Sequence, residues 1–132
     1  MQTGENIAEK KAWREVKYRE KFKNAFRGLY VFVKTTRHLS VHVISALIAI
    51  VSGFYFQISS VEWALVVFAI GIVFITEALN TAIEIDIDLT SPEYHPYARD
   101  TKDVAAAAVL LSAFMSVVVG LIIFLPKILN MI

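Results

Sequence analysis

The stretch "TEALNTAIEIDIDL", residues 76–89, decides how this chain can fold. It directly continues the apolar run "WALVVFAIGIVFI", residues 63–75, which is typical of a membrane-spanning helix. Yet the stretch itself contains four carboxylates: Glu77, Glu84, Asp86 and Asp88. One ionisable side chain deep in a membrane helix costs about 2.5–3.5 kcal/mol on insertion scales, so several of them must face protein, water or cations.

Most of these acidic side chains share one face of the predicted helix. Since successive helical residues are rotated by about 100°, three of the carboxylates and one amide fall within about 80° of arc. These four residues are Glu77, Asn80, Glu84 and Asp88. Asp86 points away from this face. Carboxylate and amide oxygens are ligands that Mg²⁺ accepts, and a carboxylate that is free of metal can act as a base toward a hydroxyl.

The composition of the chain indicates an integral membrane protein. Of its 132 residues, 57% are hydrophobic and only 19% are charged, whereas average proteins contain about 25% charged residues. The length suggests a single domain, residues 1–132. The net charge of +1 gives no reason to expect nucleic acid as a partner, and the absence of cysteine excludes disulfides and thiolate metal sites.

Three long apolar segments are predicted to cross the membrane. They cover about residues 41–59, about residues 62–89 and about residues 103–126. A helix needs about 20 residues to cross the hydrocarbon core of a bilayer. The first and third segments meet this length with uncharged runs, whereas the second meets it only if its carboxylates lie toward one end.

The distribution of basic residues predicts the orientation of these segments. Ten of the thirteen Lys and Arg precede residue 38, and the connection between the second and third segments carries Arg99 and Lys102. The connection "SSVE", residues 59–62, carries neither Lys nor Arg. By the positive-inside rule, the N-terminus and the carboxylate end of the second segment are cytoplasmic. We therefore expect a multi-pass protein of the plasma (inner) membrane.

A different kind of helix is predicted for residues 13–37. Its apolar side chains recur at helical spacing on one face: Tyr18, Phe22, Ala25, Phe26, Leu29 and Val33. Its lysines and arginines lie mostly elsewhere on the helix. Such a basic amphipathic helix is typical of a membrane surface, and the alternative is a helix that packs on a partner protein.

The third apolar segment carries small residues at every fourth position. These are Ala108, Ser112, Ser116 and Gly120. Such a stripe lets membrane helices approach closely, either between the subunits of a homo-oligomer or within one chain, and the sequence leaves both open. Three spans make a thin bundle, so a homo-oligomer is the simplest way to enclose the carboxylate face.

The pair Lys102-Asp103 begins the third segment on the same, cytoplasmic side as the carboxylate face. A lysine beside acidic groups that bind Mg²⁺ is a combination that handles phosphate. The residues alone therefore predict phosphoryl transfer at the membrane surface. The alternative is an ion or proton pathway, because carboxylates inside membranes also act in relays.

Three weaker signals favour structural roles. His38 and His42 have a spacing that can bind a metal from one helix, but no third ligand lies near them in the sequence, so packed or interfacial histidines are favoured. Trp63 is interpreted as an anchor at the membrane interface. Ser91-Pro92 predicts a helix N-cap followed by proline at the first helical position.

Two neighbouring motifs resemble the prokaryotic diacylglycerol kinase family of small three-span lipid kinases. They are "EALNTAIEIDID", residues 77–88, and "SPEYHPYARDTKDVAAAAV", residues 91–109. The family pattern is Glu-x-x-Asn-(Thr/Ser)-Ala-Ile-Glu-x-x-x-Asp, followed by Glu-Tyr-His and by Ala-Lys-Asp. The resemblance covers roughly residues 22–128, and "GLIIFLPKI", residues 120–128, resembles the undecaprenol kinase branch in particular.

The resemblance implies a homotrimer that binds MgATP in sites between subunits. It implies that Glu77 is the general base on the lipid hydroxyl and that Glu84 ligates the metal, while Asn80 and Asp88 shape and polarise the site. The implied nucleotide-binding residues are Glu84, Asp88, Glu93, Tyr94, His95, Lys102 and Asp103. The N-terminal helix would close this site with the family's usual spacing of Phe22, Ala25 and Gly28.

One position departs from the family pattern. Many members carry Thr-Glu-Arg-Asn before the first span, and that Glu is a second metal ligand. Here the sequence reads "KTTRHLSVH", residues 34–42, so Thr36 occupies the position. A threonine hydroxyl is a weaker and neutral ligand, so we expect a lower affinity for the metal.

The sequence thus predicts an all-α integral membrane protein with an N-terminal amphipathic surface helix and three transmembrane helices, assembled as a homotrimer. Its predicted function is that of an ATP-dependent, Mg²⁺-dependent lipid kinase that phosphorylates the hydroxyl of a membrane lipid alcohol, with undecaprenol favoured. One alternative is a diacylglycerol kinase that uses the same site. The others are a non-catalytic membrane homologue and a small ion-conducting oligomer.

Overall fold

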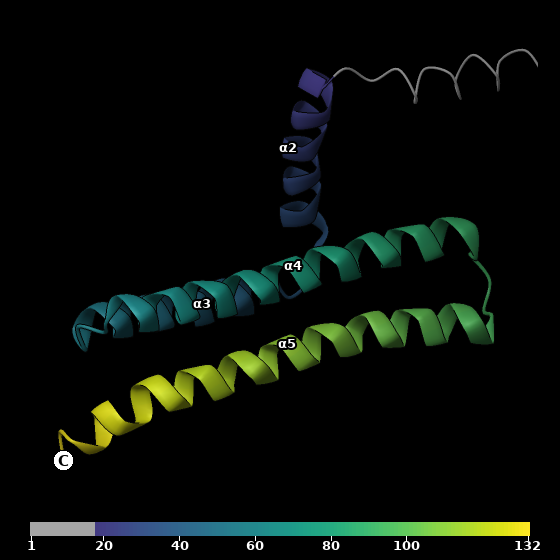
Figure 1. Ribbon diagram of the computed structural model, residues 1–132. Helices are drawn as coiled ribbons and strands as arrows, with labels where there is room; N and C mark the ends of the chain where they lie inside the picture. Colours follow the sequence, from purple (N-terminus) through teal and green to yellow (C-terminus); the bar gives the residue numbers. More distant parts are fainter. Residues whose placement is uncertain (1–17) are drawn as a thin grey trace, which may run out of the picture. The chain divides into compact units, whose positions relative to one another are not determined.

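The computed structural model describes residues 18–132, which form four α-helices and no strand. The helices are α2 (Tyr18–Thr35), α3 (Leu39–Tyr55), α4 (Ser60–Thr90) and α5 (Pro96–Leu129), shown in Figure 1. The predicted all-α fold is therefore confirmed for this part of the chain. Of the predicted N-terminal helix, residues 13–17 lie outside the described residues. The chain divides into two compact units, one that ends at Thr35 and one that begins at Thr36.

Helix α2 is amphipathic, as its sequence pattern predicts. Phe22, Phe26 and Leu29 lie on its apolar face and are 70%, 71% and 58% exposed. Glu20 in the first turn and Lys34 in the last turn match the partial charges at the two ends of the helix. A helix that leaves large apolar side chains uncovered needs a membrane or a protein surface to bury them, and its placement on the membrane stays a prediction.

The second unit, residues 36–132, is built on two long antiparallel helices. In Figure 1, α4 and α5 run side by side over most of their length, and α3 lies against the N-terminal half of α4. The buried core is small, and its one cluster consists of Ile58, Val66 and Ile123, with partly buried apolar side chains packed around them. By length and composition, α4 and α5 are each able to cross a membrane.

Helix α3 ends in a Schellman motif, which forms the turn to α4. The amide of Ile58 donates to the carbonyl of Gly53 at 3.2 Å, and the amide of Gln57 donates to that of Phe54 at 3.3 Å. Gln57 takes a positive φ of 49°, as this motif requires at its C′ position. The turn thereby places Ile58 in the core and brings Trp63 against Gly53.

Gly53 is required by close packing, and replacing it is expected to destabilise the fold. A Cβ at this position would lie 2.7 Å from Cη2 and 2.8 Å from Cζ2 of Trp63, whose ring also packs on Phe54 with centroids 4.9 Å apart. We expect Gly53→Ala to lower the free energy of unfolding by about 1–3 kcal/mol, measured as thermal unfolding in detergent. Gly71→Ala is the matched control, since nothing lies within 4 Å of its Cβ. Equal stability of both variants would contradict this packing.

The connection between α4 and α5 corrects one prediction. Residues 91–95 are not helical, and α5 begins instead at Pro96, with His95 as the N-cap that accepts a hydrogen bond from the amide of Tyr97 at 3.3 Å. The prediction of a helix start at Ser91-Pro92 is therefore wrong. The physical reason is the second proline. A residue that precedes proline is disfavoured in the α region, and His95 accordingly has φ −139° and ψ 133°, so a helix starting at Pro92 would break there.

The small-residue stripe of α5 packs within the chain at two of its positions. The hydroxyl of Ser112 lies 2.8 Å from that of Thr76 on α4, and the hydroxyl of Ser116 donates to the carbonyl of Ala69 at 3.0 Å. Of the two alternatives that the sequence left open, these contacts favour packing between α4 and α5 of one chain. Small side chains at these positions allow the two helices to approach closely.

Candidate active site

The carboxylate face of α4 passes from a buried to an exposed environment. Glu77 is buried, with 6% of its surface exposed, whereas Glu84 and Asp88 are exposed about two and three turns further along the helix. The side chain of Asn80 lies between them, and its amide nitrogen donates to Oε1 of Glu84 at 3.2 Å. The face therefore joins a shielded carboxylate to an open group of carboxylates at the C-terminal end of α4.

Glu77 is held against the first turn of α3. Its Oε2 lies 3.7 Å from Nε2 of His42, and the two side chains are only 8% and 16% exposed. The ring of His42 also meets Phe74 edge-on, with centroids 6.5 Å apart. The spacing of His38 and His42 had suggested a possible metal pair, but the structure gives His42 a carboxylate neighbour instead.

Asn80 carries an unused hydrogen-bond acceptor. Its Oδ1 is buried and has no hydrogen-bond partner within residues 18–132. Buried polar atoms are nearly always paired, so an unpaired one points to a ligand, a water or a partner chain that completes it. Asn80 also lines an open groove of about 510 Å³ between α4 and α5, together with Tyr97, Asp100 and Thr101. The groove gives a polar ligand room to reach this amide.

The start of α5 brings one lysine to the carboxylate face. The ammonium of Lys102 donates to Oδ1 of Asp88 across the gap between α5 and α4. Asp103 is exposed, and its Oδ2 lies 4.0 Å from Nε of Arg99. Lys102 and Asp103 were both predicted to contact phosphate. Lys102 lies beside Asp88 on the carboxylate face, whereas Asp103 forms an ion pair with Arg99.

The predicted nucleotide residues of the connecting loop stand apart from this group. Glu93 and Tyr94 are exposed, Tyr94 at 76%, and His95 caps α5 and stacks on Tyr97 with centroids 5.7 Å apart. None of the contacts described for the loop joins these three side chains to α4. Their role toward a nucleotide stays a prediction.

Thr36 is paired with another hydroxyl. Its Oγ1 lies 2.9 Å from Oγ1 of Thr81, which is buried on α4 one turn from Glu77. The family resemblance assigns a second metal ligand to position 36. Here that position carries a neutral hydroxyl, which contacts the hydroxyl of Thr81 on α4. Within residues 18–132, no three carboxylate or imidazole side chains converge as a metal cluster would require.

The donor set nevertheless suits a magnesium ion that arrives with phosphates. Mg²⁺ usually keeps several waters and takes one or two protein carboxylates together with phosphate oxygens. Glu84 is exposed and offers its carboxylate beside Asn80, whose Oδ1 is unpaired. Glu84 therefore fits a metal carried by a nucleotide better than a metal held by the protein alone.

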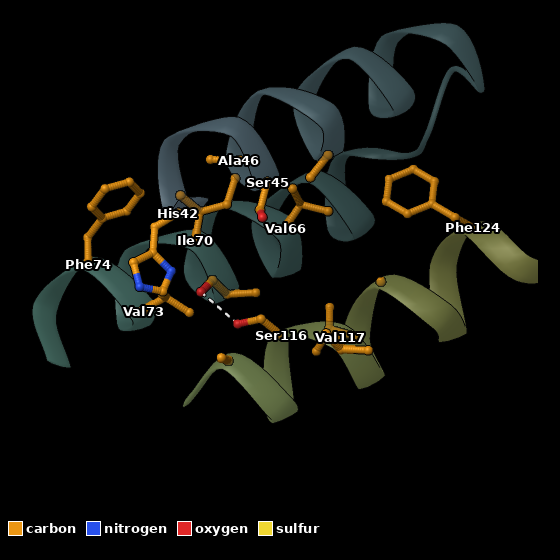
Figure 2. A pocket seen from close by; sticks show the side chains of 15 residues that line it. His42, Ser45, Ala46, Val66, Ile70, Val73, Phe74, Ser116, Val117 and Phe124 are labelled. Carbon is orange, nitrogen blue, oxygen red and sulfur yellow. Dashed lines mark hydrogen bonds between the residues drawn. The ribbon is translucent and has the colours of Figure 1, made fainter. Parts of the chain in front are cut away.

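A cavity of about 200 Å³ lies next to this site, between α3, α4 and α5. Figure 2 shows its wall, with His42 and Phe74 at one end and Phe124 at the other. The lining is mostly apolar, and its polar side chains include Ser45 and Ser116. His42 thus stands between an apolar cavity and the buried carboxylate.

Two of these contacts could not be found from the sequence. The pairs His42–Glu77 and Thr36–Thr81 depend on how α3 packs on α4, and helical periodicity does not report that packing. The one available signal was that His42 is the single histidine in a segment without formal charge.

Comparison with known proteins gives one family and several relatives. The model of the family described as prokaryotic diacylglycerol kinase matches residues 23–124. The undecaprenol kinase of Bacillus subtilis (strain 168) is 41% identical over 106 residues, which are 80% of this chain and 86% of that protein. The diacylglycerol kinase of Synechocystis is 33% identical over 111 residues, 83% of this chain and 63% of that protein. The diacylglycerol kinase of Escherichia coli (strain K12) is 31% identical over 75 residues, 57% of this chain and 62% of that protein.

Proposed function

The chain belongs to the prokaryotic diacylglycerol kinase family, and we propose that it is a membrane lipid kinase that moves the γ-phosphoryl group of ATP to the hydroxyl of a lipid alcohol. One observation of the structure supports this proposal above the others. The carboxylate face begins at a buried acid, Glu77, and ends at exposed acids beside Lys102. A shielded base next to an open, charged surface is what a reaction between a lipid hydroxyl and a nucleotide needs.

In the proposed reaction, Glu77 takes the proton of the lipid hydroxyl as its oxygen attacks the γ-phosphorus. The bond between that phosphorus and the oxygen bridging to the β-phosphate breaks, and ADP leaves. The ammonium of Lys102 offsets part of the negative charge of the phosphates, so most of the catalysis is positioning and electrostatic stabilisation. The ammonium of Lys102 is held close to the carboxylates by Asp88.

Magnesium is the implied cofactor, and Glu84 is the side chain that would hold it. When bound with the nucleotide, Mg²⁺ neutralises charge on the phosphate oxygens. Asn80 orients Glu84 through its amide nitrogen. The exposed carboxylate of Glu84 leaves the approach to phosphate oxygens open.

We place the protein in the plasma (inner) membrane, with the N-terminus and the carboxylate end of α4 in the cytoplasm. Helices α4 and α5 supply two spans, and α3, with 17 residues, would supply the third, since about 17–25 residues suffice to cross. The apolar face of α2 would lie on the cytoplasmic membrane surface. A homotrimer would cover the exposed Glu84 and Asp88, which a single chain leaves open.

Undecaprenol is the proposed acceptor, and diacylglycerol is the second candidate. The relative named undecaprenol kinase matches this chain over 80% of its length, and the motif "GLIIFLPKI" resembles that branch. Both lipids present a primary hydroxyl at the membrane interface, so the reacting residues need not differ.

A lipid panel tests this function. The purified full-length protein in mixed micelles is given Mg²⁺ and ATP labelled at the γ-phosphate, with undecaprenol, diacylglycerol or undecaprenyl acetate, which lacks a free hydroxyl. We expect labelled lipid phosphate from undecaprenol, less from diacylglycerol and none from the acetate. Preference for diacylglycerol would reassign the substrate, and no labelled lipid from either alcohol would overturn the kinase.

Restoring the family's acidic residue gives a further prediction. We expect Thr36→Glu to lower the Mg²⁺ concentration for half-maximal activity by about tenfold, because a charged ligand is added near the site. Thr36→Val is the control, since it removes the hydroxyl contact with Thr81 without adding charge. An unchanged Mg²⁺ requirement in Thr36→Glu would show that position 36 lies outside the metal site of this protein.

A further inference from the structure

His42 has no part in the reaction described so far, yet it is the side chain that faces the proposed base. Its Nε2 lies 3.7 Å from Oε2 of Glu77. Among the residues that the structure describes, His42 is the one basic side chain with a nitrogen within 4 Å of this carboxylate. The imidazole itself is fixed, because its ring meets Phe74, which lies one turn before Glu77 on the same helix.

We propose that His42 is a positioning residue for Glu77, holding the carboxylate in the orientation from which it takes the proton of the lipid hydroxyl. This inference rests on the proposed function, in which Glu77 is the base. His42 acts through Glu77 and is not itself expected to touch the lipid or the nucleotide.

The distance between the two side chains suits this role. At 3.7 Å the pair is too long for a hydrogen bond, so the carboxylate oxygen keeps the lone pair that must receive the proton. A proton on Nε2 of His42 would attract the carboxylate and favour one orientation of it over the others. A flexible glutamate that loses this restraint can move by 1 Å or more, and such a displacement can cost about 100-fold in rate.

His42 also closes one end of the apolar cavity, as Figure 2 shows. Two roles are therefore possible for the same side chain, since a ring of this size also fills space between α3 and α4. The two roles differ in one atom, the nitrogen that faces Glu77. Leucine at this position keeps most of the volume and removes the nitrogen, whereas the amide nitrogen of glutamine reaches about as far as Nε2 of histidine.

The kinetic test compares His42→Leu and His42→Gln with the wild type, all full-length and in mixed micelles with undecaprenol. We expect His42→Leu to lower kcat by about 10- to 100-fold while KM for MgATP changes by less than about twofold. We expect His42→Gln to recover most of the lost kcat. His38→Leu is the matched control, since His38 is exposed and lies four residues earlier. An unchanged kcat in His42→Leu, or an equal loss in both His42 variants, would overturn the positioning role.

A second readout does not depend on catalysis. The ring signals of His42, assigned by NMR in detergent, are expected to shift when Glu77 is replaced by Gln, and those of His38 are not. Unmoved His42 signals would mean that the contact is absent and would overturn the inference. A wild type that phosphorylates no lipid, with His42 signals that do respond, would instead overturn the proposed function and leave the contact as a structural one.

Discussion

Glu77→Gln is expected to lower kcat for lipid phosphorylation by about 10²–10⁴-fold, the usual contribution of a positioned general base. Glutamine preserves the shape of the side chain and can still approach His42, but it cannot accept a proton. Because Glu77 is buried at the shielded end of the carboxylate face, we expect the dissociation constant for MgATP to stay within about twofold of the wild-type value. Initial rates with labelled ATP and equilibrium nucleotide binding measure the two quantities.

Asp86→Asn is the matched control for this prediction. Asp86 is an exposed acid on the same helix, and it points away from the carboxylate face. We expect its activity to stay close to that of the wild type. A positioned general base contributes about 100-fold or more to the rate. A folded Glu77→Gln variant that retains more than about a tenth of the wild-type kcat would therefore contradict the assignment of Glu77 as the base.

Lys102→Met is expected to have the second largest effect, about 10²–10³-fold on kcat/KM for MgATP. Methionine keeps the length of the apolar stem and removes the charge that offsets the phosphates. The loss should appear as weaker nucleotide binding together with a lower kcat, unlike the result expected for Glu77→Gln. Steady-state kinetics at varied MgATP separate these two cases.

Lys127→Met controls for the loss of an ion pair between α5 and α4. Lys127 lies at the other end of α5 and pairs with Glu62 at 3.1 Å, and its side chain is 30% exposed, compared with 37% for Lys102. Both substitutions remove one cation from one acid of α4, but only the first lies at the carboxylate face. Similar losses in both variants would mean that Lys102 acts on helix packing rather than on the nucleotide.

The sequence predicted the helical elements and the polar face well, because both follow from local periodicity. The apolar run 63–75 and the carboxylates at helical spacing require only the geometry of one helix, and α4 carries both. The short helical turn predicted to begin at Ser91-Pro92 is absent, because two prolines compete and the residue before Pro96 is disfavoured in the α region. Both Pro92 and Pro96 can be read from the sequence, and the error was to assign the helix start to the first of them.

The parts of the site that depend on helix packing could not be predicted. Whether His42 faces Glu77, lipid or a partner depends on how α3 is rotated against α4, and a helix that is apolar on most sides gives little sign of that rotation. Whether the stripe containing Ser112 and Ser116 packs within the chain or between subunits was open for the same reason, and the contacts with α4 favour packing within the chain.

We propose that the carboxylate face of α4 is tolerated in a membrane protein because it binds a magnesium nucleotide. Paramagnetic Mn²⁺ in place of Mg²⁺, added with a non-hydrolysable ATP analogue, tests this claim by NMR. Since α4 has 31 residues and is about 46 Å long, its two ends are easily distinguished. We predict strong broadening of amide signals near Glu84 and Lys102 and none near Glu62 and Lys127. Equal broadening at both ends, or none near Glu84 while the nucleotide is bound, would contradict the account.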